Sequence, residues 1–282
     1  MRDAAHFRVA VGFFDGVHLG HRAILEQADA ALTFRVHPLA VLAPARAPKL
    51  LMDFDSRIAA IRATGVREVA ALAFTRELAD LPPGDFVRRH LSPLAKGAPL
   101  TVRCGDDWRF GRGGAGSAEL LREMGLAVES VPFSIWKGAR ISSSRIRAAL
   151  AAGDLDGAAA MLGAAYRICA PVVPGKGIGR ALGFPTLNFA VDTPLRCGVY
   201  EVRLGAVRGI ANYGLAPTMG DRAWTTPTLE VHLLDGEVPT VERPEIEFRR
   251  FLRDERAFAS VAELKAAIAA DIRAVLHFAG LR

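Results

Sequence analysis

Short apolar runs alternate with helical patterns through the first half of the chain, and this alternation constrains the fold more than any other feature. The expected strands are residues 7–14, 31–36, 68–74, 99–105 and 126–133. The expected helices are residues 21–32, 55–65 (with Asp55 or Ser56 as N-cap), 82–91 and 117–125. Strands joined by helical crossovers form a parallel sheet, so the sequence predicts an α/β domain whose ligands bind beyond the carboxyl ends of the strands.

The pattern changes after residue 163. Two short helices, 144–153 and 154–163, are expected to close the first half, each ending at a glycine. The later runs are short and separated by Gly and Pro, which predicts an antiparallel barrel or sandwich; they span residues 166–175, 198–205, 207–214, 227–236 and 243–252. A final helix over 260–278 opens with a capping box, Ser260 and Glu263, and packs through an apolar stripe on the barrel. That stripe consists of Val261, Leu264, Ile268, Ile272 and Val275. The sequence therefore predicts two domains, 1–163 and 164–282.

Composition narrows the class of protein. The 282 residues are 51% hydrophobic, as expected for a chain with packed cores. The net charge of +6 favours anionic ligands, but basic residues form no long run and do not interleave with aromatics, so we expect no nucleic-acid partner. Three scattered cysteines suit a reducing, cytoplasmic location, and no apolar run is long enough to span a membrane. Self-association is left open.

The segment GFFDGVHLGH, residues 12–21, lies where the first strand passes into a helix. The N-terminus of a helix carries partial positive charge and binds phosphate. His18 and His21 can donate to phosphate oxygens there, and Gly20 lets the backbone approach a ligand. Two other interpretations are an ordinary turn with two surface histidines and a zinc site, although no third ligand is evident.

Two further segments of the first half suit a phosphate-binding site. ISSSRIRAAL, residues 141–150, places serine hydroxyls and Arg145 at a helix start, and the alternative is a capped surface helix. CGDDWRFGRGGAG, residues 104–116, contains a literal G-x-G-x-x-G. The expected strand ends about six residues too early for a dinucleotide-binding turn, so we discount that interpretation.

The second half contains a glycine-rich segment and an alternating strand. GKGIGRALGFPTLNF, residues 175–189, lacks the Lys-Ser/Thr of a Walker loop. In TLEVHLLD, residues 228–235, alternation places Leu229, Val231 and Leu233 on one face and Glu230 with His232 on the other. Taken alone, these segments are a Gly/Pro loop and a strand with a solvent-facing carboxylate.

Together the motifs resemble the prokaryotic bifunctional riboflavin kinase/FAD synthetase family. His18-Leu19-Gly20-His21 is similar to the H-x-G-H of adenylyl-transferring enzymes, and ISSSRIR to the family's I-S-S-T-R-I-R. GRALGFPTLN resembles G-R-x-L-G-F-P-T-A-N, and the A-N-x-G-x-x-P-T and E-x-H patterns follow in order. The resemblance implies a Rossmann-like nucleotidyltransferase domain, an antiparallel β-barrel riboflavin kinase domain and a terminal helix.

The resemblance also implies roles for individual residues. Glu230 would be the catalytic base of the kinase, His18 and His21 would act in adenylyl transfer, and Thr186 with Asn188 would bind Mg²⁺. The implied nucleotide-binding residues are Gly12, Phe13, Asp15, Gly20, Asp107, Ser143, Ser144, Arg145, Gly175, Gly179 and Arg180. The implied flavin-binding residues are Gly183, Pro185, Asn212, Thr218 and Arg253. ATP would be the co-substrate, and riboflavin, FMN and FAD the substrates and products.

The chain departs from the family at three places. The connection after H-x-G-H is short, and Arg35 and Val36 replace an acid–Pro pair in TFRVHP. The segment DGEVPTVERPEIEF, residues 235–248, replaces a Leu-Tyr-Gly turn. The first two changes motivate an alternative, a riboflavin kinase with a weakened or inactive adenylyltransferase domain. A flavin-responsive regulator is a more remote alternative, since no helix-turn-helix segment is evident.

Overall fold

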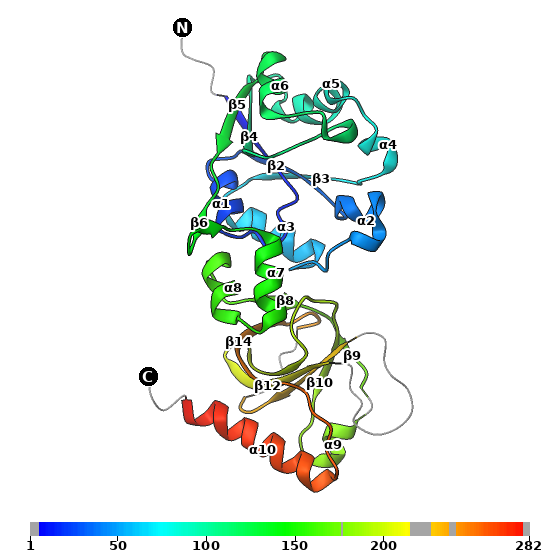
Figure 1. Cartoon of the computed structure of the whole chain (residues 1–282), viewed down its shortest axis with the longest axis vertical. Helices are drawn as coiled ribbons and strands as arrows, with labels where there is room; N and C mark the ends of the chain where they lie inside the picture. Colours follow the sequence, from blue (N-terminus) through cyan, green and yellow to red (C-terminus); the bar gives the residue numbers. More distant parts are fainter. Residues whose placement is uncertain (1–5, 176, 215–226, 237–240, 279–282) are drawn as a thin grey trace. The chain divides into compact units, whose positions relative to one another are not determined.

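The computed structural model describes residues 6–175, 177–214, 227–236 and 241–278 (Figure 1). Two compact units divide the chain. The N-terminal unit contains residues 1–48 and 53–143, and the C-terminal unit contains residues 49–52 and 144–282. The domain boundary predicted at residue 163 lies on the C-terminal side of this division, which falls between residues 143 and 144. The assignment of one function to residues 1–163 and another to residues 164–282 stays a prediction.

Five parallel strands form the sheet of the N-terminal unit, as the sequence predicted. They are β1 (Phe7–Val11), β2 (Ala30–Phe34), β3 (Glu68–Leu72), β4 (Leu100–Gly105) and β5 (Ala127–Val131). Their order is β3-β2-β1-β4-β5. The chain winds one way from β1 to β3 and the other way from β4 to β5. The carboxyl ends of β1 and β4 therefore form a switch point, where ligands bind to sheets of this kind.

Helices cover both faces of this sheet, with α5 and α6 on one face and α1 and α3 on the other (Figure 1). The helices are α1 (Leu19–Leu25), α2 (Pro38–Leu42), α3 (Phe54–Ala63), α4 (Arg76–Ala79), α5 (Pro83–Phe86) and α6 (Ala118–Glu123). A π-helical turn, Val87–Leu91, follows α5. Short 3₁₀ turns span Pro44–Arg46, Ser92–Ala95 and Arg112–Gly114. A small hairpin consists of β6 (Ile135–Trp136) and β7 (Ala139–Arg140).

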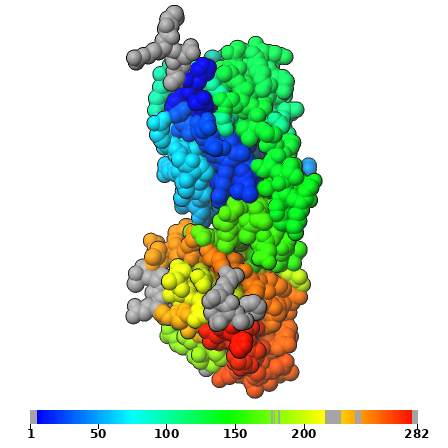
Figure 2. Space-filling model, turned by 90° about the vertical axis from the view of Figure 1, so that its left-hand side faces the viewer, coloured from blue at the N-terminus to red at the C-terminus, as the bar shows by residue number. Residues whose placement is uncertain are grey.

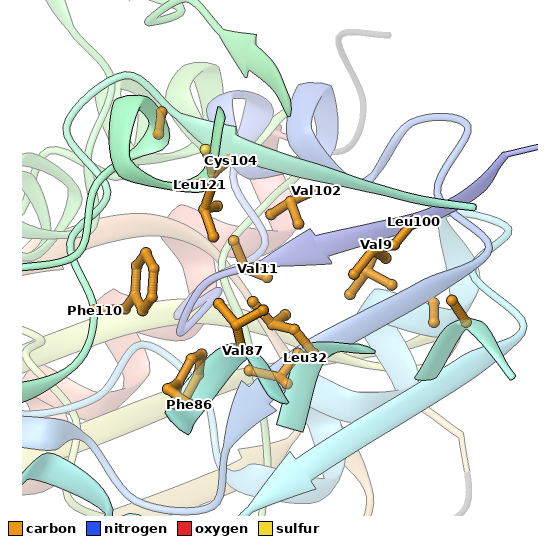
Figure 3. Packing of buried hydrophobic residues seen from close by; sticks show 14 of the residues in the cluster. Val9, Val11, Leu32, Phe86, Val87, Leu100, Val102, Cys104, Phe110 and Leu121 are labelled. Atoms are coloured by element: carbon orange, nitrogen blue, oxygen red, sulfur yellow. The ribbon is translucent and has the colours of Figure 1, made fainter. Parts of the chain in front are cut away.

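One hydrophobic cluster of the N-terminal unit lies between the sheet and the helices α5 and α6 (Figure 3). Val9 and Val11 of β1 are 0% and 1% exposed, and they pack with Val102 of β4 against Phe86 and Leu121. Fully burying side chains of this size stabilises a fold by roughly 1.5–3 kcal/mol each. This packing fixes the end of β1, from which the first candidate site extends.

Two sequence predictions in this unit were wrong in detail. The helix expected over 21–32 ends at Leu25, because Gln27 adopts a left-handed φ of 59° and the following residues join the sheet as β2. Asp53 caps α3, since its Oδ1 accepts the N–H of Ser56 at 2.9 Å. The expected N-cap residues Asp55 and Ser56 instead lie inside that helix.

An antiparallel sheet curled into a half-barrel forms the body of the C-terminal unit (Figure 1). Its strands are β8 (Arg167–Cys169), β9 (Val172–Val173), β10 (Leu187–Ala190), β11 (Gly198–Leu204), β12 (Val207–Gly214), β13 (Thr228–Leu233) and β14 (Glu245–Arg253). The order is β8-β14-β11-β12-β13-β10-β9. Only residues 170–171 separate the edge strands β8 and β9, so the sheet must curl to bring its edges together.

The described residues contain four further helices. They are α7 (Ser143–Ala152), α8 (Leu155–Leu162), α9 (Ile178–Leu182) and α10 (Val261–Phe278). A backbone hydrogen bond links the end of α7 to the segment before β11, because the N–H of Arg196 donates to the Leu150 carbonyl at 3.0 Å. The segment 49–52 belongs to the same unit because Leu51 accepts the Tyr166 hydroxyl at 3.0 Å.

The terminal helix lies on the outside of the C-terminal unit (red in Figure 2). Val275 is buried and Leu264, Ile268 and Ile272 are half-buried, as the predicted stripe requires, but Val261 is 43% exposed. The expected cap is present in part: Ser260 accepts the N–H of Glu263 at 3.2 Å, whereas the Glu263 carboxylate accepts from Ala259.

Candidate active sites

The turn between β1 and α1 has a strained backbone at the switch point of the parallel sheet. Phe14 and Val17 adopt left-handed φ values of 58° and 37°, and the intervening Gly16 has a φ of 85°. Such conformations cost on the order of 1–3 kcal/mol at a non-glycine residue. Gly12 makes room for the Phe14 ring, which would lie 2.9 Å from an added Cβ. The Arg22 Nε donates to the Val17 carbonyl at 3.2 Å and fastens the end of the turn.

His18 is the N-cap of α1. Its Nδ1 accepts the backbone N–H of His21 at 3.2 Å, and the residue is 5% exposed. Burial lowers the pKa of His18 to about 4, and the nearby Arg140 cation adds to the shift. A neutral imidazole that accepts at Nδ1 carries its proton on Nε2. His18 therefore has an Nε2–H available to donate to a ligand.

His21 packs directly on that ring. The His18 and His21 ring centroids are 3.6 Å apart at an interplanar angle of 14°, and Phe14 meets His21 edge-on at 5.4 Å. Burial lowers the pKa of His21, with His18 and Arg140 contributing. Its buried Nδ1 has no hydrogen-bond partner. Gly20 allows the stack, because an added Cβ would lie 3.3 Å from the His18 ring.

Residues distant in sequence meet this turn. The Ser143 hydroxyl donates to the Asp15 carbonyl at 2.9 Å, so Ser143 lies beside the histidine turn in the N-terminal unit. Asp15 itself is 2% exposed. Asp107 is exposed and accepts two bonds from the Arg140 guanidinium, at 2.5 and 3.2 Å. Sequence reasoning missed Arg140, although it immediately precedes the ISSSRIR segment.

Two predicted residues of that segment belong to the C-terminal unit. Ser144 is exposed and accepts a bond from Arg147 at 3.1 Å, while Arg145 is half-buried. Their placement beside the histidines stays a prediction.

Arg57 is a second residue that the sequence did not reveal. Its side chain is fully buried in α3, and Nη2 donates to the carbonyls of Phe34 and Arg35 at 2.6 and 3.2 Å. The guanidinium carbon lies 3.9 Å from the ring centroid of Phe13. Burial lowers the pKa of Arg57, and the carboxylates of Asp15 and Asp53 oppose that shift. Arg57 thus joins the ends of β1 and β2 beside the histidine turn.

The C-terminal unit places three predicted residues in one row across its sheet. Glu230 of β13 lies directly opposite Asn188 of β10 on one side and Asn212 of β12 on the other. Residues in register on neighbouring antiparallel strands point to the same face, with Cβ atoms about 4.5–5.5 Å apart. Glu230 is therefore flanked by two side-chain amides, and all three residues are half-buried.

The glycine-rich segment comes close to this row. A Cβ at Gly175 would overlap the Asn188 side chain, and a Cβ at Gly179 would lie 3.2 Å from the Thr186 hydroxyl. Gly183 adopts a φ of 91° and ends α9. His232 bonds the Pro185 carbonyl through Nδ1 at 2.8 Å. These contacts bring the predicted residues of the segment to the Glu230 face of the sheet.

Two predicted residues stand apart from that group, and a third is not described. Arg180 is exposed in α9. Arg253 is held by Asp271 of α10 through bonds of 2.8–3.2 Å, so its visible contacts fasten the terminal helix, and its flavin role stays a prediction. Thr218 lies outside the described residues.

Two negative findings concern only the described ranges. No cluster of three or more His, Cys, Asp or Glu side chains there could hold a metal ion. In the same ranges, no helix has both the length and the apolar character needed to cross a bilayer.

An α/β unit with a histidine-capped helix at its switch point, followed by an antiparallel half-barrel with an Asn–Glu–Asn row, defines a two-part nucleotide-using transferase. Comparison with family models agrees. The FAD synthetase model matches residues 2–145 and the riboflavin kinase model matches residues 162–279. The chain belongs to the family of bifunctional riboflavin kinase/FAD synthetase proteins.

Curated relatives match nearly the whole chain. The Escherichia coli K12 protein named bifunctional riboflavin kinase/FMN adenylyltransferase is 35% identical across 97% of this chain and 93% of its own length. Proteins of the same name from Pseudomonas fluorescens and Bacillus subtilis are 36% and 31% identical. A solved structure entitled "Crystal Structure of Macrolide-efflux Protein from Streptococcus pneumoniae" has a TM-score of 0.80 at 25% identity, covering 96% of this chain and 94% of that one.

Proposed function

We propose that this chain makes FAD from riboflavin in two ATP-dependent steps. Residues 164–282 would phosphorylate riboflavin to FMN, and residues 1–163 would adenylylate FMN to FAD with release of pyrophosphate. The observation that carries the proposal is the presence of two separate sites, the His18–His21 stack in one unit and the Asn188–Glu230–Asn212 row in the other. The two family models and the names of the relatives support the same pair of reactions.

In the kinase step, Glu230 accepts the proton of the terminal ribityl hydroxyl as that oxygen forms a bond to the γ-phosphorus of ATP. The bond to the β-phosphate oxygen breaks, and ADP leaves. Asn188 and Asn212 flank the carboxylate on the same face of the sheet, where Asn188 lies on the phosphate side and Asn212 can bind a hydroxyl group of the substrate. Gly175 and Gly179 keep the segment beside Asn188 and Thr186 free of side chains that would fill the phosphate site.

The donors around Glu230 fit a magnesium ion. The Thr186 hydroxyl and the Asn188 amide carbonyl are hard oxygen ligands, and Mg²⁺ commonly takes only one or two protein ligands beside substrate phosphates. Bound there, the ion would neutralise phosphate charge during attack by an oxygen nucleophile.

In the adenylyl step, a phosphate oxygen of FMN attacks the α-phosphorus of ATP and the α–β bridging bond breaks. No covalent intermediate with the protein is needed, so the site acts by positioning and charge stabilisation. The Nε2–H of His18 donates to a phosphate oxygen, and the N-terminus of α1 supplies further partial positive charge. Ser143 would add a phosphate contact, with Arg140 as a nearby cation, and the nucleotide-binding roles of Ser144 and Arg145 stay predictions of the family resemblance.

A product assay tests the proposal. Purified protein is incubated with riboflavin and MgATP, and the flavins are separated by chromatography over time. We expect FMN to rise first and FAD to follow with stoichiometric pyrophosphate. FMN without FAD would support a kinase with an inactive adenylyltransferase unit. Flavin binding without ATP turnover would overturn both enzymatic assignments and favour a flavin-responsive binding protein.

We also propose a cytoplasmic location, because the three cysteines are dispersed over Cys104, Cys169 and Cys197 in the manner of a reduced protein. Cell fractionation tests this. Self-association is tested separately by analytical ultracentrifugation with and without flavin.

A further inference from the structure

Glu255 lies just beyond β14, and it contacts the Asn–Glu–Asn row of the kinase site. One carboxylate oxygen accepts the Nδ2–H of Asn212 at 3.0 Å. Asn212 is in turn the direct cross-strand neighbour of Glu230. The motifs that pointed to riboflavin phosphorylation did not single out Glu255.

A glycine makes room for this contact. Gly214 lies two residues beyond Asn212 on β12, so both face the same side of the sheet. A Cβ built at Gly214 would overlap the carboxylate of Glu255. The A-N-Y-G sequence of β12 therefore provides both a donor for Glu255 and the space that its carboxylate occupies.

The contact fixes which way the Asn212 amide points. An ionised carboxylate has only acceptors, so the NH₂ group of Asn212 must face Glu255. The Oδ1 atom of the same amide is then left to accept a hydrogen bond elsewhere. Without Glu255 the amide could flip and present a donor instead.

We propose that Glu255 is a positioning residue of the riboflavin kinase site, which it serves by holding Asn212 with Oδ1 turned to accept from a hydroxyl of the polyol chain of the flavin substrate. This inference rests on the proposed kinase function and adds a specificity device to it. A polyol presents hydroxyl donors beside Glu230, and a fixed acceptor next to the base sets the position of the chain. The phosphates of ATP offer only acceptors, so Asn212 in this orientation discriminates between the two substrates.

The test measures equilibrium binding of riboflavin by fluorescence quenching, alongside steady-state kinase kinetics. For Glu255→Ala we expect the riboflavin Kd and KM to rise about tenfold, with the KM for ATP within twofold of wild type. Gly214→Ala should give the same pattern while both partners remain, because the added methyl displaces the carboxylate. Glu245→Gln is the control, since Glu245 is an exposed residue of β14 that pairs with Arg167. It should leave all constants unchanged.

A reciprocal exchange tests the orientation itself. Asn212→Asp places two carboxylates together and should weaken riboflavin binding at least as much as Glu255→Ala. Adding Glu255→Gln to Asn212→Asp restores a donor–acceptor pair and still leaves an acceptor oxygen at position 212. We expect that double variant to recover riboflavin affinity at least threefold over the Asn212→Asp single variant.

These measurements distinguish failure of the positioning role of Glu255 from failure of the kinase assignment. If wild-type protein phosphorylates riboflavin but Glu255→Ala and Gly214→Ala bind it normally, the positioning role is overturned and the kinase assignment stands. Equal increases in the KM values for riboflavin and ATP, or no recovery in the double variant, would also overturn it. Absence of riboflavin binding and phosphorylation by wild-type protein would overturn the kinase assignment together with this inference.

Discussion

The Nδ1 atom of His18 accepts the backbone N–H of His21 at 3.2 Å, and the two rings stack at a centroid separation of 3.6 Å. One histidine thus caps a helix and supports the other at the same time. Protonating His18 at Nδ1 would remove the acceptor from the cap and place a cation in a buried site. The His18 and His21 rings must therefore both be neutral when no anion is bound, so the stability of the fold depends on pH.

We expect the N-terminal unit to lose stability as the pH falls from about 6.5 to about 4. The folded pKa of His18 is lowered from 6.5 to about 4, so between these values the unfolded chain takes up a proton that the folded chain does not. The stability is therefore fully present above the unfolded pKa and is lost as the pH approaches the folded one. At ~1.4 kcal/mol per pKa unit, the loss from His18 is about 3 kcal/mol.

Urea denaturation followed at pH 7.5, 5.5 and 4.5 measures this loss. His18→Asn is the informative variant, because asparagine is a good N-cap and does not titrate in this range. Its unfolding free energy should fall less steeply with decreasing pH than that of wild type. An identical pH dependence in the two proteins would show that His18 does not titrate on unfolding.

Glu230→Gln should remove the catalytic base without removing the side chain. The amide can still occupy the position between Asn188 and Asn212 but cannot accept the hydroxyl proton. We expect the kinase kcat to fall 10²–10⁴-fold, the usual range for loss of general-base catalysis. Conversion of supplied FMN to FAD should remain at the wild-type rate, which serves as the internal control for folding. A kinase rate within threefold of wild type would exclude Glu230 as the base.

The alternation of strands and helices predicted the parallel sheet, because five buried apolar runs leave few other arrangements. The end of α1 was predicted wrongly because the apolar residues of β2 continue its helical spacing and no proline or glycine separates them. The family motifs indicated Glu230 and Asn188 as separate site residues. The register of β10 and β13 in the structure shows that they lie directly opposite one another.

The residues that contact the predicted site residues, Glu255 and Arg140, could not be predicted from motifs or periodicity. Glu255 contacts Asn212 across 43 positions of sequence, and Arg140 contacts Asp107 across 33. Local periodicity contains no information about such pairs, because they depend on which strand ends the fold brings together.

Replacing Arg57 should lower both the stability of the fold and the rate of adenylyl transfer. Arg57→Met removes a buried cation whose Nε and Nη1 have no hydrogen-bond partner, which by itself favours the variant. The same change removes the donor to the Phe34 and Arg35 carbonyls and the stack on Phe13. The lost hydrogen bonds and cation–π contact outweigh the gain from removing the unpartnered nitrogens, so we expect net destabilisation of about 1–3 kcal/mol.

Adenylyl transfer by Arg57→Met should fall at least tenfold, while riboflavin phosphorylation stays unchanged. Thermal denaturation and the two-step product assay measure both effects. Arg57→Lys keeps the charge but cannot reach both carbonyls from one planar group, so it should be intermediate in both measurements. A variant that is destabilised yet fully active in FAD formation at 20 °C would limit Arg57 to a structural role.

Gly175→Ala tests the approach of the glycine-rich segment to the metal-binding amide. The added methyl would overlap the Asn188 side chain, so either the segment or the amide must move. Because Asn188 is the proposed Mg²⁺ ligand opposite Glu230, its displacement should raise the Mg²⁺ concentration needed for half-maximal kinase activity. We expect an increase of about five- to tenfold, measured by titrating MgCl₂ at fixed, saturating ATP. Gly205→Ala changes a turn glycine whose φ of 60° strains the backbone of any other residue but whose added Cβ would have no neighbour within 4 Å. It controls for the general cost of adding a methyl group in this unit, and an equal shift in both variants would show that Gly175 has no specific role beside Asn188.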